Sequence, residues 1–152
     1  MALYLVQHGK SLSKEIDPEQ GLSERGIREV EIIAETAAAY NVKVGRIEHS
    51  GKKRAAQTAE LFAGKLGMPK VSIAEGLKPL DDVTRKAAAL PPAADLMLVG
   101  HLPFMERMAS YLTTGSTDYT VFTFQNGGIV CLEKLEDSAF WSIKWALMPH
   151  VG

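Results

Sequence analysis

The chain of 152 residues has an ordinary globular composition, with 46% hydrophobic and 23% charged residues. A chain of this length buries about two-thirds of the surface that its unfolded form exposes, so we expect a single domain over residues 1–152. The one cysteine, Cys131, excludes intramolecular disulfides, zinc ribbons and iron–sulfur clusters. A net charge of −1, with no long run of either sign, argues against broad electrostatic binding of nucleic acid.

No segment of the sequence has the length and hydropathy of a membrane span. The first apolar run is five residues long, with no basic residue before it. No later run approaches the roughly 18 apolar residues that a spanning helix needs. We therefore expect a cytoplasmic protein that does not contact a membrane.

Strand and helix patterns alternate along most of the chain. Short apolar runs predict strands at 3–6, 47–50, 71–74 and 95–99. Helical periodicity predicts helices at 23–40, 53–66, 82–90 and 103–111. A polar loop at 10–20 follows the first strand, and two antiparallel strands at 128–133 and 140–147 end the series. The first helix has one apolar face, which we expect to be buried: Ile27, Val30, Ala34, Ala37 and Ala38.

This alternation is typical of an α/β fold in which helices cover both faces of a mostly parallel sheet, a three-layer αβα arrangement. Sheets of this kind bind ligands at the carboxyl ends of their strands. His8 follows the first strand, Arg54 the second and His101 the fourth. We therefore expect these three side chains to meet at one edge of the sheet.

The groups at this edge suit an anion. Gly9 and Gly100 fit places where the backbone passes close to other groups, and Pro103 opens a helix whose free N–H groups can hold an anion. Two imidazoles, a guanidinium and a helix N-terminus suit phosphoryl transfer, because one neutral histidine can attack phosphorus while the other groups neutralise the equatorial oxygens. The sequence therefore predicts a phosphate site.

Three segments carry these residues, with the sequences LVQHG at 5–9, SGKKRAAQTA at 50–59 and VGHLP at 99–103. Together they resemble the histidine phosphatase superfamily, and the resemblance extends over nearly the whole chain. The small size, the GLSERG helix start at 21–26 and the segment 124–132 are most similar to the SixA-type phosphohistidine phosphatases. The fold implied by the resemblance is the phosphoglycerate mutase-like αβα fold.

The resemblance also implies roles for single residues. His8 would be the nucleophile that becomes phosphorylated, Arg54 and His101 would hold the phosphoryl group, and the backbone of Leu102 would donate a hydrogen bond to it. Gln7 and Gly9 complete the expected phosphate-binding set, and no metal or cofactor is implied. The implied partner is a phosphorylated protein, such as a histidine phosphotransfer domain of a two-component relay, whereas the oligomeric state is not indicated.

Position 7 departs from the superfamily, whose triplet is Arg-His-Gly where this chain has Gln7-His8-Gly9. The amide of glutamine can donate a hydrogen bond but lacks the charge and the bidentate fork of arginine. Losing one charge-assisted contact would cost about 2–4 kcal/mol of transition-state stabilisation, or roughly thirtyfold to a thousandfold in rate. We expect a slower enzyme rather than an inactive one.

No motif identifies the carboxylate that superfamily members use as a general acid against phosphoesters. Glu75, Asp81 and Asp82 follow the third strand and are candidates, although a solvated turn accounts for them equally well. An alkoxide leaving group needs a proton, whereas histidine, with a pKa of about 6.5, leaves as neutral imidazole once its ring is protonated. A missing acid is therefore tolerable for phosphohistidine and damaging for a sugar phosphate.

Each proposed site residue also has a structural interpretation. His8 can be a buried histidine bonded to backbone, His101 a helix cap and Arg54 an ordinary first-turn residue. Their common arrangement favours a chemical role. His49 and His150 have no motif role, and no two histidines have the i, i+4 spacing of a helical zinc pair.

The sequence therefore predicts a phosphatase that removes phosphoryl groups from phosphohistidine on a signalling protein, through a phosphohistidine intermediate at His8. The short chain leaves little material for a lid, and an open site suits a protruding side chain of a protein. Two alternatives remain. One is a phosphatase of small phosphate esters or anhydrides, which needs one of the three carboxylates as acid, and the other is a non-catalytic module that binds phosphorylated proteins.

Overall fold

The computed structural model describes residues 2–91 and 95–151, so both ends of the expected 1–152 domain fall outside the described residues. Helices and strands alternate as the sequence predicts, each within three residues of its expected bounds. In chain order they are β1 (Ala2–Gln7), α1 (Glu24–Ala39), β2 (Arg46–His49), α2 (Lys53–Lys65), β3 (Lys70–Ile73), α3 (Val83–Ala88), β4 (Leu96–Gly100), α4 (Phe104–Thr114), β5 (Ile129–Lys134) and β6 (Trp141–Leu147). None of the described helices is both long and apolar enough to cross a bilayer.

The sheet is mostly parallel, with strand order β3-β2-β4-β1-β5-β6. Strands β1 to β4 pair in parallel, and β5 and β6 add an antiparallel edge beside β1. In chain order, β2 and β3 lie successively further from β1 towards one edge of the sheet, and β4 then lies between β2 and β1. Because parallel crossovers are right-handed, this reversal of direction moves the connecting helices to the opposite face of the sheet.

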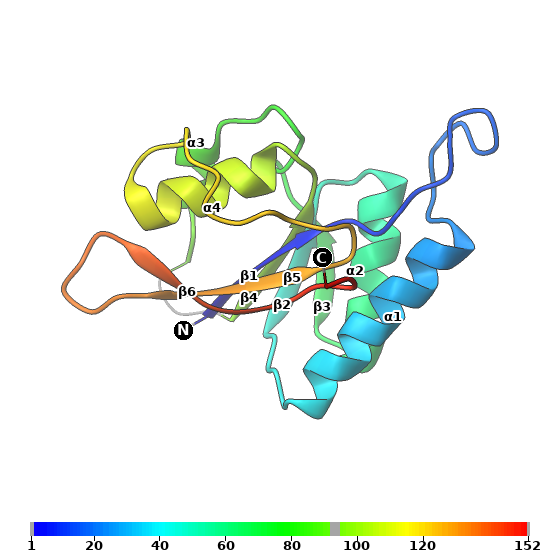
Figure 1. The fold of residues 1–152 in the computed structure, drawn as a ribbon, viewed down its shortest axis with the longest axis horizontal. Coiled ribbons are helices and arrows are strands. Elements are labelled where there is room, and N and C mark those ends of the chain that lie inside the picture. The colour runs from blue at the N-terminus through cyan, green and yellow to red at the C-terminus, as the bar shows by residue number, and fades with distance from the viewer. Residues whose placement is uncertain (1, 92–94, 152) are drawn as a thin grey trace.

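The helices form the two outer layers of a three-layer αβα fold, as predicted (Figure 1). Helices α1 and α2 cover one face of the sheet, and α3 and α4 cover the other. Alternate residues of the central strands supply the two cores, because successive side chains of a strand point to opposite faces. Tyr4, Val6, Met97 and Val99 pack under α1 and α2, whereas Leu3, Leu5, Leu96 and Leu98 pack under α3 and α4.

Helix α1 begins where the sequence predicts, with the Ser23 hydroxyl accepting a hydrogen bond from the Gly26 N–H. Its buried face differs from the predicted one and consists of Gly26, Val30, Ile33, Ala34 and Ala37. Ile27 and Ala38 are only half-buried. The cause lies at Gly26, where an added Cβ would come within 2.1 Å of the Lys10 carbonyl oxygen. The glycine therefore faces the loop after β1, and the buried face of the helix includes Gly26 and Ile33 in place of Ile27 and Ala38.

Candidate active site

The main chain of His8 is held from two sides at the carboxyl end of β1. Its N–H donates to the Gly100 carbonyl at 2.9 Å, which ties it to β4. Its carbonyl accepts from the Asn126 side-chain amide at 3.0 Å and from the Gly127 N–H at 3.2 Å. The position of His8 is therefore set by a strand and by a turn more than a hundred residues away in the sequence.

The His8 ring carries its proton on Nδ1. That nitrogen lies 2.7 Å from the Gly9 carbonyl oxygen, which can only accept, so in a neutral ring the lone pair is on Nε2. Burial lowers the pKa of His8 below 6.5, and the charge of Arg54 lowers it further, against the opposing effect of the Gly9 bond. At neutral pH the ring is therefore uncharged, and an imidazole in this form is chemically able to act as a nucleophile.

His101 follows β4 and lies just before α4, as predicted. Its side chain is buried, and the centroid of its ring lies 5.0 Å from that of His8. Burial, together with the charges of His8, Arg54 and Lys52, lowers the pKa of His101 to about 3, so this ring is neutral as well. Its Nε2 lies 2.6 Å from the Ser50 hydroxyl, whereas its buried Nδ1 has no hydrogen-bond partner among the described residues.

Arg54 lies in the first turn of α2 and is half-buried. Its charge lowers the pKa of both histidines, so its guanidinium is near both rings. Within residues 2–91 and 95–151 no carboxylate forms an ion pair with it. The residues that cap α2 and α4, Lys52 and Pro103, make no side-chain cap hydrogen bond. Two helix N-termini and a guanidinium can therefore bind an anion here.

Two glycines allow close packing around the histidines, as predicted. A Cβ at Gly9 would come within 2.8 Å of Val30 Cγ2, and a Cβ at Gly100 would come within 2.8 Å of Met105 Cε. The Gly9 N–H also donates to the Thr58 hydroxyl at 2.9 Å. The segment that carries His8 is thus packed against α1 and bonded to α2.

Gln7 and Leu102 flank the two histidines. The Gln7 Cα lies opposite Gly100 in the β1–β4 pair, and its side-chain Oε1 is buried with no hydrogen-bond partner among the described residues. Leu102 is half-buried between His101 and the cap residue Pro103. Both are beside the rings, in positions compatible with the expected phosphate contacts.

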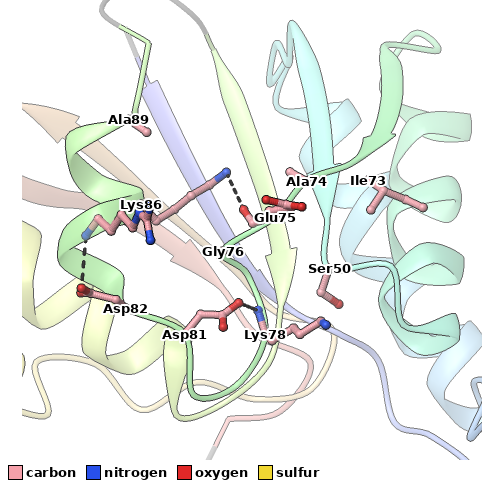
Figure 2. A pocket seen from close by; sticks show the side chains of 11 residues that line it. Ser50, Ile73, Ala74, Glu75, Gly76, Lys78, Asp81, Asp82, Lys86 and Ala89 are labelled. Atoms are coloured by element: carbon pink, nitrogen blue, oxygen red, sulfur yellow. Dashed lines mark hydrogen bonds between the residues drawn. The ribbon is translucent and has the colours of Figure 1, made fainter.

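The three candidate acids line a pocket of about 660 Å³ that also reaches Ser50 (Figure 2). Asp82 caps α3 and Asp81 accepts from the Lys78 N–H at 2.9 Å. The hydroxyl and N–H of Thr84 hold the pKa of Asp82 below its usual value, which is the wrong direction for a proton donor. The Glu75 carboxylate makes no hydrogen bond or ion pair within the described part of the chain.

Sequence reasoning missed the roles of two residues. Ser50 belongs to one of the quoted segments, but only the folded chain brings its hydroxyl to His101. Asn126 lies in the segment Gln-Asn-Gly-Gly, whose turn-forming composition was the one local signal that it has a structural function. In both cases the partner is distant in the sequence.

The other two histidines lie elsewhere. His49 is buried and its Nδ1 is 3.1 Å from the Gly51 N–H, and exposed His150 pairs with Glu29. Across the residues that the structure describes, no group of three or more His, Cys, Asp or Glu side chains is arranged to hold a metal ion.

Comparison with solved structures identifies relatives of this fold. The histidine phosphatase SixA in complex with tungstate has a TM-score of 0.85 and 24% identity, covering 98% of this chain and 97% of that chain. A protein assigned as phosphohistidine phosphatase SixA from Agrobacterium tumefaciens has a TM-score of 0.79 and 24% identity, covering 97% of each chain. Phosphoserine phosphatase from Entamoeba histolytica, in complex with 3-phosphoglyceric acid, has a TM-score of 0.73 and 16% identity, covering 95% of each chain.

The structural likenesses agree with the predicted αβα fold. No curated protein sequence matches this chain significantly. The family model of the histidine phosphatase superfamily (branch 1) matches residues 3–81, which is more than half of the 152 residues. This chain therefore belongs to branch 1 of the histidine phosphatase superfamily.

Proposed function

We propose that this protein removes phosphoryl groups from phosphohistidine on a partner protein, through a phosphohistidine formed at His8. The proposal rests above all on the bond from His8 Nδ1 to the Gly9 carbonyl, which leaves Nε2 as a free nucleophile. A neutral His101 ring 5.0 Å away and the Arg54 guanidinium, which forms no ion pair with any described residue, supply groups for the phosphoryl oxygens. A phosphorylated histidine phosphotransfer domain is the proposed partner.

The reaction has two steps. In the first, the lone pair of His8 Nε2 attacks phosphorus, and the phosphorus–nitrogen bond of the substrate breaks with its electron pair going to the leaving imidazole. That imidazole is already protonated on its other nitrogen, so it departs neutral. In the second step water attacks phosphorus, and the bond from phosphorus to His8 Nε2 breaks with its electron pair returning to the ring. The product leaves as dihydrogen phosphate, which keeps both protons of the water, and the ring is neutral again. Arg54, His101, Gln7 and the N-terminus of α4 hold the oxygens in both steps.

The electrostatics of the site favour phosphohistidine over an alkyl ester. His101 is neutral, with a pKa of about 3, and has no extra proton to give at neutral pH. Asp82 accepts hydrogen bonds from the hydroxyl and the N–H of Thr84, which lower its pKa and stabilise its ionised form. An alkoxide would leave unassisted, whereas a protonated imidazole needs no acid. The likeness of the fold to SixA is in keeping with this substrate class.

The proposal is tested by comparing substrates. We expect kcat/KM for a histidine-phosphorylated phosphotransfer domain to exceed that for glycerol 3-phosphate by about 100-fold or more, the usual contribution of a general acid. Because no metal takes part in the proposed steps, EDTA should leave both rates unchanged. Equal rates with the two substrates, or faster turnover of the glycerol ester, would show that the substrate class is wrong.

Arg54 should contribute through its charge. Arg54→Ala removes the guanidinium whose charge acts on both rings, so kcat/KM should fall by about 10²- to 10³-fold. Arg54→Lys keeps the charge without the bidentate fork and should recover part of the loss. The exposed Arg28 offers a control, and Arg28→Ala should keep the wild-type rate. If the folded Arg54→Ala protein kept full activity, Arg54 would not contribute to catalysis.

One observation favours a second candidate function, hydrolysis of small phosphate esters. The pocket of about 660 Å³ beside Ser50 contains the Glu75 carboxylate, which makes no hydrogen bond or ion pair within the described part of the chain. If Glu75 is an acid, Glu75→Gln should reduce ester hydrolysis by about 100-fold or more, while Glu60→Gln on the exposed side of α2 should not. If Glu75→Gln hydrolysed esters at the wild-type rate, Glu75 would not be the general acid that the second candidate function requires.

A further inference from the structure

Ser50 and His101 form a buried pair at the carboxyl edge of the sheet. Ser50 follows β2 and His101 follows β4, and these strands are parallel neighbours in the sheet. The distance from Ser50 Oγ to His101 Nε2 is 2.6 Å, and the two residues are 7% and 2% exposed. Solvent therefore does not compete for this hydrogen bond.

The direction of this bond is tied to where His101 carries its proton. Because burial keeps this ring neutral, only one of its two nitrogens has a hydrogen. The Lys52 N–H points to Ser50 Oγ at 3.4 Å, so the serine oxygen already accepts from the backbone. The hydroxyl hydrogen is then available to donate to Nε2, which leaves the ring hydrogen on Nδ1.

The surroundings of Nδ1 favour a donor at that atom. Two buried side-chain atoms lack hydrogen-bond partners among the described residues, His101 Nδ1 and Gln7 Oε1. The Gln7 Cα lies opposite Gly100, the residue before His101, and its Oε1 can only accept. Phosphoryl oxygens also only accept. His101 Nδ1 and Gln7 Oε1 form no hydrogen bond with each other in this structure. A phosphoryl oxygen placed at Nδ1 would meet a lone pair if that nitrogen were unprotonated, whereas Nδ1–H can donate to it.

We propose that Ser50 is a positioning residue whose hydroxyl donates to His101 Nε2 and so holds the ring in the Nδ1–H tautomer, which donates to a phosphoryl oxygen. The identity of that acceptor rests on the proposed function. The tautomer itself does not depend on the substrate and can be measured in the protein without one. Ser50 thus acts through His101 and does not touch the reacting atoms.

The first test is NMR of the full chain labelled with ¹⁵N-histidine. We expect His101 in the unliganded wild type to show a protonated-type shift at Nδ1 and an unprotonated-type shift at Nε2. Inorganic phosphate, added as a probe, should then shift the Nδ1–H resonance. A wild-type ring protonated on Nε2 would overturn the proposal, and this result needs no variant.

Variants separate the hydroxyl from the packing of Ser50. Ser50→Ala should shift His101 towards the Nε2–H tautomer and lower kcat by about 10- to 100-fold with little change in KM, as expected when a catalytic group is misaligned. Ser50→Thr retains the hydroxyl and should keep both the tautomer and most of the rate. Ser110 is a matched control, because it is also buried and bonds a backbone carbonyl, so Ser110→Ala should leave the His101 tautomer unchanged.

The outcomes distinguish this inference from the proposed function. A Ser50-dependent Nδ1–H tautomer in a protein that turns over no phosphohistidine would support the positioning role and reject the proposed substrate. A protein that turns over phosphohistidine, with a His101 tautomer unchanged in Ser50→Ala, would support the substrate and reject the positioning role. If Ser50→Ala does not fold, Ser50→Thr and the wild-type spectrum still decide the tautomer.

Discussion

At the scale of single residues, position 7 is where we expect a substitution to raise the rate most. Gln7 brings a neutral amide to the carboxyl end of β1, and its Oε1 has no partner among the described residues. Gln7→Arg adds charge-assisted hydrogen bonds to the phosphoryl oxygens and should raise kcat/KM by about 10- to 100-fold. Gln7→Met, which is similar in size and uncharged, should give no gain. A folded Gln7→Arg protein no faster than wild type would contradict this account of position 7.

The pH dependence of the rate depends on His8. The attacking ring must be neutral, and burial lowers its pKa below 6.5. The neutral form of His8 therefore predominates above pH 6.5, and the contribution of His8 to kcat/KM should be lost as the pH falls below that value. Rates measured from pH 5 to 8, corrected for acid hydrolysis of the substrate, should show an acid limb centred below 6.5. A limb centred above 6.5 would mean that the His8 environment favours the charged ring.

At the scale of elements, Thr58 couples α2 to the segment that carries His8. Its hydroxyl is buried, accepts from the Gly9 N–H at 2.9 Å and donates to the Arg54 carbonyl at 2.8 Å. Thr58→Val leaves the Gly9 N–H unsatisfied, so the free energy of unfolding measured in urea should fall by about 1–3 kcal/mol. The Thr36 hydroxyl bonds only its own helix, and Thr36→Val should change stability by about 0.5 kcal/mol or less. Similar losses of unfolding free energy in the two variants would show that the Thr58 bond to Gly9 does not stabilise the fold.

The sequence predicts the helices and strands well because their signals are local: apolar runs for strands, caps and 3.6-residue spacing for helices. The end of α4 was missed. The predicted helix stops at residue 111, whereas α4 continues to Thr114, because the Thr113 and Thr114 hydroxyls bond carbonyls of the preceding turn and Gly115 supplies a left-handed cap.

Candidate site residues could be predicted where topology alone brings them together. The carboxyl ends of parallel strands meet at one edge, so His8 and His101 could be assigned to one place from the sequence. Side-chain contacts between distant segments could not be predicted from the sequence, because no local pattern encodes them. The bond from Asn126 to His8 joins residues 118 apart, and that between Ser50 and His101 joins residues 51 apart.

At the scale of the whole molecule, the buried neutral His101 links folding to pH. Its pKa is about 3 in the folded chain and about 6.5 when unfolded, so between these values the unfolded chain binds more protons. The free energy of unfolding should therefore rise with pH across this window, by up to about 1.4 kcal/mol per pH unit from this residue. Urea unfolding from pH 4 to 7 should show a shallower slope for His101→Asn than for the wild type. An equal slope in the two proteins would mean that His101 titrates normally when folded.

The phosphorylated enzyme is the central species of this account, and trapping it is the most direct test. The protein is mixed with a ³²P-labelled phosphohistidine protein, quenched in alkali, where phosphohistidine survives, and compared with His8→Ala and His49→Gln. We predict label on the wild type and on His49→Gln, none on His8→Ala, and release of inorganic phosphate on longer incubation. Folded wild-type protein that binds the donor yet acquires no label and releases no phosphate would contradict the account and favour a non-catalytic phosphoprotein-binding module.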